Sequence, residues 1–379
     1  MTHRPALQRG PFGTAPSGED VDLWHLASDA GVTAEVLTYG GILHALTVPD
    51  LAGEAGSVVL SLGSVDQYAE KSPYFGAIVG RYANRIARGR FVLDGAEHRV
   101  PANDRGHALH GGPEGFDKRM WQAEPLPDEG PATLRLSLRS PDGDMGFPGA
   151  LDVTTVYSLD GAGTLAVDYT ATTDRPTVVN LSQHAYFNLA GRGDVLDHTL
   201  QVDADAYLPI SAEGIPLGPA APVAGTAFDL TSGRRLGDVL DQPHPQLAAA
   251  GGGYDHCWLL RGDAPRGELR RAARLTAPSA RRVMEVWTTE PGLQVYTGNQ
   301  LDGSLTGHDG DPHPLHGAVC LETQHLPDSP NRPDYPTTVL RPGQVLCSRT
   351  EFRFPHLAAA RANRAPAVTE RIQKKCCTG

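Results

Sequence analysis

Short extended segments separated by turn signals run along almost the whole chain, and they limit the fold more than any other feature. Segment 90–100 places Asp94 and Gly95 between two extended runs, a pair typical of a two-residue type I′ hairpin turn. Segment 151–173 repeats this arrangement, with its turn at 160–163. Further runs rich in Val, Thr, Tyr and Trp, which favour strands, cover 33–39, 42–48, 199–210, 256–260, 281–289 and 293–299.

Helical periodicity is scarce. Its best example is the Ala-rich, basic segment 356–375, which Pro366 interrupts. No repeat of roughly 20–50 residues is visible, so neither a propeller nor a solenoid is expected. The pattern predicts an all-β protein, a single large antiparallel β-sandwich over residues 11–356. We expect residues 1–10 to form an N-terminal extension and residues 357–379 an exposed or poorly ordered basic tail.

Composition limits the ligands that the protein binds. The formal net charge is −11, whereas nucleic-acid binding needs a basic surface that displaces counterions. The same charge argues against an anionic membrane surface, and no run of 18 apolar residues exists to span a bilayer. We therefore expect a small neutral or polar ligand, no nucleic acid and no membrane. The oligomeric state, monomer or homodimer, stays open.

The cysteines point to a reducing compartment. The chain has five, an odd number that does not suggest a disulfide framework. Cys257, Cys320 and Cys347 lie among apolar neighbours and are predicted to be reduced core residues. Cys376 and Cys377, near the end, do not form a prenylation box. Because the N-terminus also has no apolar signal segment, a cytoplasmic protein is expected.

Two polar residues in apolar surroundings are the first candidates for chemistry. Glu322 interrupts the apolar run that begins at Ala318, directly before a Pro-rich loop. A strand that ends in an irregular loop can hold a working side chain still at the edge of a pocket. His184 lies in the alternating segment 181–189 and shares a face with Ser182, Tyr186 and Asn188. The alternative for both residues is a purely structural hydrogen bond.

Other polar residues stand beside turns and glycines. Asn84 and Arg85 lie between an apolar run and a turn, and Asp255 follows a Gly run. His110 precedes two glycines, where the missing Cβ lets backbone and ligand approach closely. Each also has a structural interpretation: an arginine that braces a loop, a histidine with its hydrogen bonds satisfied, and an aspartate in a turn.

The sequence contains no clear metal or cofactor site. Glu322 and His325 have a spacing that shares a face only on a helix, which the Pro-rich flank disfavours. His313 and His316 lie in a Gly/Asp/Pro-rich loop and are expected to be exposed. Nucleotide-binding loops and CxxC pairs are missing from the sequence. We therefore predict neither a metal nor a cofactor.

Six strings, taken in order, resemble the aldose 1-epimerase (galactose mutarotase) family, and the resemblance extends from about residue 11 to about residue 355. The strings are FGAIVGRYANRIARGRF, LHGGPEGFDKRMW, LSQHAYFNLAG, YDHCWLL, TTEPGLQVYTGNQLDG and CLETQHLPDSPN. Two departures from the family pattern could alter substrate preference: Ala185 stands where serine is common, and Cys257 and Trp258 follow the Asp-His pair.

The resemblance implies a β-supersandwich and an isomerase. The expected activity is interconversion of the α- and β-anomers of free hexoses such as galactose and glucose, without a cofactor. By the same resemblance Glu322 matches the general base and His184 the general acid. The matching sugar-hydroxyl contacts are Arg85, His110 and Asp255, with Asn84 and Gln294 as further contacts.

Mutarotation suits such a pair, because ring opening removes a proton from the C1 hydroxyl and delivers one to the ring oxygen. His184 would serve as the acid if Glu322 or Asp255 kept it protonated near neutrality. Three alternatives stay open: an epimerase of hexose phosphates, a non-catalytic carbohydrate-binding sandwich, and a glycoside hydrolase that uses Glu322 with Asp255. The preferred sugar is not predicted.

Overall fold

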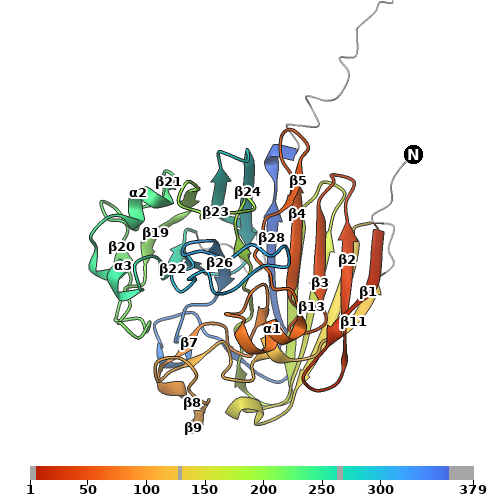
Figure 1. Cartoon of the computed structure of the whole chain (residues 1–379). Coiled ribbons are helices and arrows are strands. Elements are labelled where there is room, and N and C mark those ends of the chain that lie inside the picture. Colours follow the sequence, from red (N-terminus) through yellow and green to blue (C-terminus); the bar gives the residue numbers. More distant parts are fainter. Residues whose placement is uncertain (1–5, 127–129, 263–267, 358–379) are drawn as a thin grey trace, which may run out of the picture.

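The computed structural model describes residues 6–126, 130–262 and 268–357, and within them three antiparallel sheets form most of the protein (Figure 1). The largest has nine strands. In order across the sheet they are β11 (Gln122–Leu126), β12 (Ala132–Ser140), β13 (Leu151–Leu159), β14 (Leu165–Thr173), β28 (Leu346–Arg353), β24 (Arg282–Thr288), β23 (Arg270–Ala277), β18 (Thr199–Val202) and β21 (Arg234–Arg235).

Two smaller sheets accompany it. The five-stranded sheet follows chain order: β1 (Ala6–Thr14), β2 (Asp20–Ala27), β3 (Thr33–Leu37), β4 (Leu43–Pro49) and β5 (Ala55–Ser57). The six-stranded sheet has the order β17 (Tyr186–Phe187), β26 (Val319–Gln324), β25 (Gly292–Tyr296), β22 (Asp255–Leu260), β19 (Ala204–Tyr207) and β20 (Ala221–Pro222).

Short elements connect the sheets. Four two-stranded pairs are β6 (Ile78–Val79) with β16 (Ser182–Gln183), β7 (Arg85–Ile86) with β10 (Ala108–Leu109), β8 (Arg90–Leu93) with β9 (Ala96–Arg99), and β15 (Thr177–Val178) with β27 (Val339–Leu340). The described helices are short: α1 (Val65–Lys71), α2 (Leu236–Leu240), α3 (Pro245–Ala249) and the 3₁₀ turns Ala87–Gly89, Phe116–Lys118, Asp144–Gly146 and Ser329–Asn331. None of these described helices is long and apolar enough to cross a bilayer.

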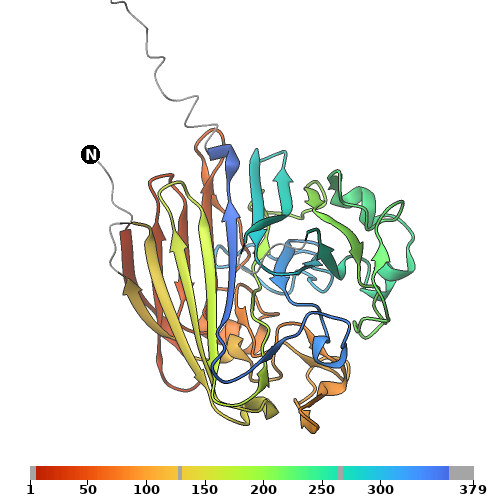
Figure 2. The ribbon, with the colours of Figure 1, turned by 180° about the vertical axis from the view of Figure 1, so that it is seen from behind.

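Among the described residues, the largest apolar cluster draws buried side chains from all three sheets, and three smaller clusters accompany it. Figures 1 and 2 show the five-stranded sheet against one half of the nine-stranded sheet and the six-stranded sheet beside the other half. Strand β13 illustrates the arrangement, since its buried residues alternate with more exposed ones, as in a sheet that covers a core on one face. The core continues into β24 and β26 through Met284, Val286 and Leu321. The predicted antiparallel β-sandwich is confirmed.

Local turn chemistry is as expected. Asp94 and Gly95 both have positive φ, which a type I′ turn requires, and they connect β8 with β9. The turn at 160–163 connects β13 with β14. The Asp160 N–H donates to the carbonyl of Thr164, and the Thr164 N–H donates to Asp160 Oδ1.

Two expectations about chain segments need correction, and a third is not tested. The run 199–210 is not one strand: β18 belongs to the nine-stranded sheet, β19 belongs to the six-stranded sheet, and the chain passes between them at Asp203. Strand β1 begins at Ala6 and pairs with β2, so it starts inside the segment that we assigned to an N-terminal extension. The predicted basic tail lies outside the described residues, apart from Leu357.

Segment 181–189 also differs from the simple alternation that its sequence suggests. It forms two short strands, β16 and β17, which pair with different partners, and all of its residues are buried. The Gln183 side chain bridges the gap between β16 and β17. Its Nε2 donates to the carbonyl of Gly76, and its Oε1 accepts from the backbone N–H of Ala185. His184 therefore lies at a break between two strands.

Candidate active site

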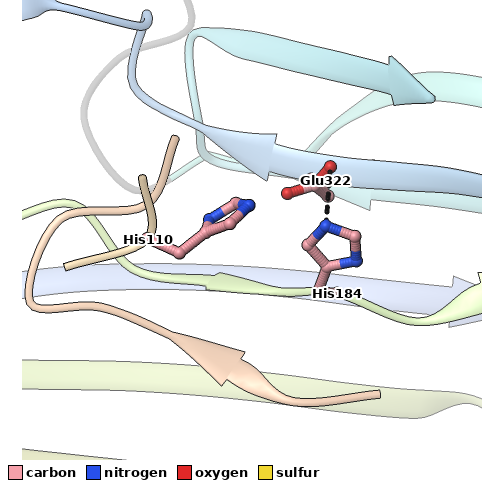
Figure 3. Close-up of side chains that lie close together, drawn as sticks. All are labelled: His110, His184 and Glu322. Carbon is pink, nitrogen blue, oxygen red and sulfur yellow. Dashed lines mark ion pairs between the residues drawn. The ribbon is translucent and has the colours of Figure 1, made fainter. Parts of the chain in front are cut away.

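Three side chains from distant parts of the chain face one another in the interior. His110, His184 and Glu322 point into a common space in Figure 3, and their nearest N and O atoms lie within 4.8 Å of one another. All three are buried. Long-range pairing of the strands and loops that carry them brings these groups together.

Glu322 lies in the middle of β26, whose residues are all buried. Its position opposite Gln294 of β25 holds the carboxyl group in a fixed register. Glu322 Oε1 is 3.6 Å from His184 Nε2, and among the described residues Glu322 Oε2 has no hydrogen-bond partner. A buried polar atom without a protein partner is available to a ligand.

His184 is held by its backbone and by aromatic contacts. Its N–H donates to the carbonyl of Ala77, and its own carbonyl accepts from Gly76. Its ring stacks on Tyr186 at a centroid distance of 5.2 Å. Within the described chain, His184 Nδ1 has no hydrogen-bond partner. The imidazole is therefore placed by packing, and its two nitrogens are left for the ligand and for Glu322.

His110 and Asn84 fix each other. Both adopt positive φ, and each backbone N–H is used: that of Asn84 donates to His110 Nδ1, and that of His110 donates to the carbonyl of Asn84. Because Nδ1 accepts a hydrogen bond, the neutral ring carries its proton on Nε2. Gly111 supports the turn, since a Cβ there would lie 2.1 Å from the carbonyl oxygen of Gly80. The glycine therefore allows two backbone segments to approach closely, as the sequence predicted.

Arg85 lies between carboxylates at the rim of this cluster. Its Nε donates to Asp104 Oδ2 at 2.8 Å, and its Nη2 is 3.5 Å from Asp255 Oδ2. The other Asp255 oxygen accepts from Gln294 Nε2 at 2.7 Å. Burial alone would lower the pKa of Arg85, but Asp255 and Asp104 outweigh it and raise that pKa. Asn84 Oδ1 accepts from the N–H of Arg85.

All seven residues that the sequence selected thus belong to one contact network, which extends from Glu322 through Gln294 and Asp255 to Arg85, Asn84 and His110. Asp104 and Tyr74 also contact this network and were not predicted from the sequence. The Tyr74 ring lies 4.5 Å from that of His110 and 5.8 Å from that of His184. Neither residue stands in an apolar run, so no local pattern marked them.

Other candidates lie outside the cluster. His325 Nδ1 pairs with Glu290 Oε2 at 2.6 Å, so the Glu322–His325 spacing has no role as a ligand pair. His313 was expected to be exposed but is buried, and its Nε2 hydrogen-bonds the carbonyl of Ser61. Cys257 and Cys320 are buried free cysteines as predicted, whereas Cys347 is exposed, near the start of β28.

Burial controls the protonation of the central pair. It lowers the pKa of His184 to about 4. It also raises the pKa of Glu322 well above the usual value; Asp255 adds to this increase and Arg85 opposes it. A neutral carboxyl beside a neutral imidazole is therefore the favoured form of the unliganded pair. His184 was expected to stay protonated if Glu322 or Asp255 stabilised its charge; in this form burial outweighs the contribution of Asp255 to the pKa of His184.

The two histidines and Glu322 are the described residues whose geometry comes closest to a metal site. The hydrogen bond from Asn84 determines which nitrogen of His110 carries the ring proton. His110 Nδ1 already accepts from the backbone, and Nε2 then carries the ring proton, so neither nitrogen offers a lone pair to a metal. His110 is instead a hydrogen-bond donor toward a ligand, and burial, together with His184 and Arg85, lowers its pKa well below the ordinary value.

The β-sandwich holds a buried carboxyl–imidazole pair rimmed by hydrogen-bonding groups, an arrangement typical of enzymes that use acid–base catalysis on small polar substrates. A sequence profile described as aldose 1-epimerase matches residues 22–353. Galactose mutarotase from Rattus norvegicus is 44% identical over 352 residues, 92% of this chain and 98% of the relative. Aldose 1-epimerase from Escherichia coli (strain K12) is 37% identical over 344 residues, covering 90% and 97%.

Solved structures agree. Galactose 1-epimerase from Lactobacillus acidophilus superposes with a TM-score of 0.80 at 31% identity, covering 92% of this chain and 99% of that one. An aldose epimerase homologue from C. elegans gives 0.79 at 26% identity with the same coverage. The chain belongs to the aldose 1-epimerase family. The predicted family and enzyme class, a carbohydrate epimerase, are thereby confirmed.

Proposed function

We propose that this protein interconverts the α- and β-anomers of free aldohexoses, with galactose and glucose as the first candidates, and that Glu322 and His184 transfer the protons. The observation that carries the assignment is the 3.6 Å contact between Glu322 Oε1 and His184 Nε2 inside a buried cluster. Both groups can then reach the two oxygens bonded to one anomeric carbon. Glycoside hydrolysis is disfavoured by the family to which the chain belongs.

In the proposed reaction Glu322 takes the proton of the C1 hydroxyl, and His184 delivers a proton to the ring oxygen. The bond between C1 and the ring oxygen breaks and leaves an open-chain aldehyde. Rotation about the C1–C2 bond presents the other face of the carbonyl, and the reverse proton transfers close the ring as the other anomer. The pair ends with the same number of protons as it began with.

The starting proton must move when sugar binds. In the unliganded site burial favours the neutral pair, with the proton on Glu322. Sugar hydroxyls that donate to the carboxylate stabilise its ionised form. The proton then passes to His184 across the short separation between the two groups. In ring closure the roles are reversed: Glu322 acts as the acid and His184 as the base, as microscopic reversibility requires.

The remaining residues hold the ring while C1 turns. We assign this role to Arg85, His110 and Asp255, with Asn84 and Gln294 as supporting contacts, because fixed hydroxyl partners reduce the entropy lost at the transition state. An acid–base pair has no use in a non-catalytic carbohydrate-binding sandwich, which makes that alternative the weaker one.

Polarimetry on freshly dissolved α-galactose, α-glucose and α-xylose tests the activity and ranks the sugars. We expect purified protein to accelerate mutarotation of at least one hexose far above the buffer rate. A rate indistinguishable from buffer for all three sugars would contradict the proposal. The same assay with galactose 6-phosphate would identify a hexose-phosphate epimerase if that sugar were preferred.

The pH dependence follows from the pKa directions. Burial lowers the pKa of His184 from 6.5 to about 4. The Glu322–His184 pair therefore carries a second proton, on His184, only below about pH 4. The raised pKa of Glu322 places loss of the single proton on the alkaline side. We expect the acid limb of kcat/KM, corrected for the buffer rate, to be centred near pH 4. An acid limb centred at 6.5 would contradict this assignment.

Arg85→Ala should mainly weaken sugar binding. A charged hydrogen bond contributes roughly 1.5–3 kcal/mol, so KM is expected to rise roughly tenfold to a hundredfold with a smaller change in kcat. Arg139→Ala, which breaks an exposed ion pair with Asp152 on the nine-stranded sheet, is the matched control and should leave KM unchanged. An unaltered KM in the Arg85 variant would remove this residue from the sugar site.

A further inference from the structure

The carboxylate of Asp104 is the meeting point of two guanidinium groups. Its Oδ2 accepts from Arg85 Nε at 2.8 Å, and both of its oxygens lie 3.3–3.4 Å from Arg105 Nε. The Asp104 main chain is held in a tight turn, where Asp104 and His107 exchange backbone hydrogen bonds. The turn therefore sets the point from which the Asp104 side chain reaches the two guanidinium groups.

The two arginines are held on their other sides as well. Arg85 Nη2 contacts Asp255, and Gly214 packs so closely that a Cβ there would lie 2.8 Å from the Arg85 Cζ atom. Arg105 Nη1 donates to the carbonyl of Ala212 at 2.8 Å, which connects the turn of Asp104 to the 211–215 turn. Arg85 is thus held by two carboxylates and the backbone at Gly214, and Arg105 is held by one carboxylate and one carbonyl.

The charges in direct contact balance. Arg85 and Arg105 supply two positive charges, and Asp104 and Asp255 supply two negative ones. Asp104 and Asp255 are also the more accessible carboxylates, with side chains 20% and 19% exposed, against 3% for Glu322. An incoming anion would meet these two groups first. A guanidinium group freed from its carboxylate is, by contrast, a strong binder of carboxylate and phosphate.

From this arrangement we propose that Asp104 is a specificity-determining residue: as the shared counter-ion of Arg85 and Arg105, it makes the site select neutral sugars and reject sugar acids. This inference rests on the proposed function and adds a residue outside the proton-transfer pair. Asp104 acts through Arg85 and is a positioning residue. Its carboxylate orients the guanidinium and cancels the charge that would attract an anionic substrate.

Two variants separate charge from position. Asp104→Asn keeps an oxygen that accepts from Arg85 but loses the charge, whereas Asp104→Ala loses both. We expect kcat/KM for α-galacturonate, relative to α-galactose, to rise at least about tenfold in both variants, because the freed guanidinium can form a charged hydrogen bond with the sugar carboxylate. The KM for galactose should rise clearly only in Asp104→Ala. The gained galacturonate activity should decrease with added salt.

Two controls complete the experiment. Asp152→Asn removes the same charge from an exposed pair with Arg139 and should leave the galacturonate-to-galactose ratio unchanged. Arg105→Ala, at an exposed position, removes one of the two positive charges that Asp104 neutralises. Asp104 then pairs with Arg85 alone, and the galacturonate-to-galactose ratio should fall.

The outcomes separate the two proposals. If the unaltered protein accelerates galactose mutarotation but both Asp104 variants keep its galacturonate-to-galactose ratio, the inference about Asp104 is overturned and the proposed function stands. A higher ratio in Arg105→Ala, or an equal rise in Asp152→Asn, also overturns it. If the unaltered protein shows no mutarotation of any tested sugar, the proposed function itself fails.

Discussion

Replacing Glu322 with glutamine should lower kcat for mutarotation by at least about a hundredfold, the lower range for loss of a general acid or base. The amide has nearly the same shape as the carboxyl group and fits the same space in β26. It can still hydrogen-bond to a sugar, so KM should change less than kcat. What it cannot do is accept and return the proton of the C1 hydroxyl at neutral pH.

Glu290→Gln is the matched control for this variant. Glu290 is also a buried glutamate, but its partner is His325, outside the cluster. Its loss should affect thermal stability and leave kcat largely unaltered. Polarimetry gives kcat, and thermal unfolding followed by circular dichroism reports the fold. If the Glu322 variant retained kcat within a few fold of the unaltered protein, Glu322 would not be a proton-transfer residue.

His184→Asn should reduce kcat by a similar factor, again at least about a hundredfold. Asparagine can hydrogen-bond where the imidazole nitrogen does, but it has no group that titrates in the relevant range. Because Glu322 and His184 work as one unit, the double variant should be only slightly slower than either single variant. Effects that multiplied in the double variant would contradict this coupling.

His198→Asn provides the corresponding control. His198 is buried, and burial lowers its pKa to about 4, the same as for His184. Its ring, however, accepts from the N–H of Leu189 and belongs to the scaffold. Removing this ring tests whether loss of any buried histidine slows the reaction. A large fall in kcat for His198→Asn, with the protein still folded, would weaken the assignment of His184.

Much of the fold was predictable because its signals are local. The Asp94–Gly95 turn needs two positive φ angles, and that requirement is visible in the two residues themselves. Strand β13 shows its buried face as an alternation along the chain. The division of 199–210 between two sheets was not predictable, because both halves are extended and only their distant partners differ.

The candidate site was partly predictable for a related reason. Glu322 and His184 stand out as polar residues in apolar runs, and family motifs mark the positions around them. Asp104 has no such sequence signal, and its contact with the cluster is the ion pair with Arg85 from a distant turn. Likewise, exposure of Cys347 and burial of His313 depend on which distant segment covers each side chain.

The sequence alone indicated the strand-rich architecture, the enzyme family and seven polar residues that the structure brings together, because composition, turns and motifs can be read along the chain. Only the tertiary structure decided which proton each group carries. The ring tautomer of His110 depends on a hydrogen bond from Asn84, and the protonation of the Glu322–His184 pair depends on burial. Both are properties of surroundings that assemble only when distant segments pack together and exclude water.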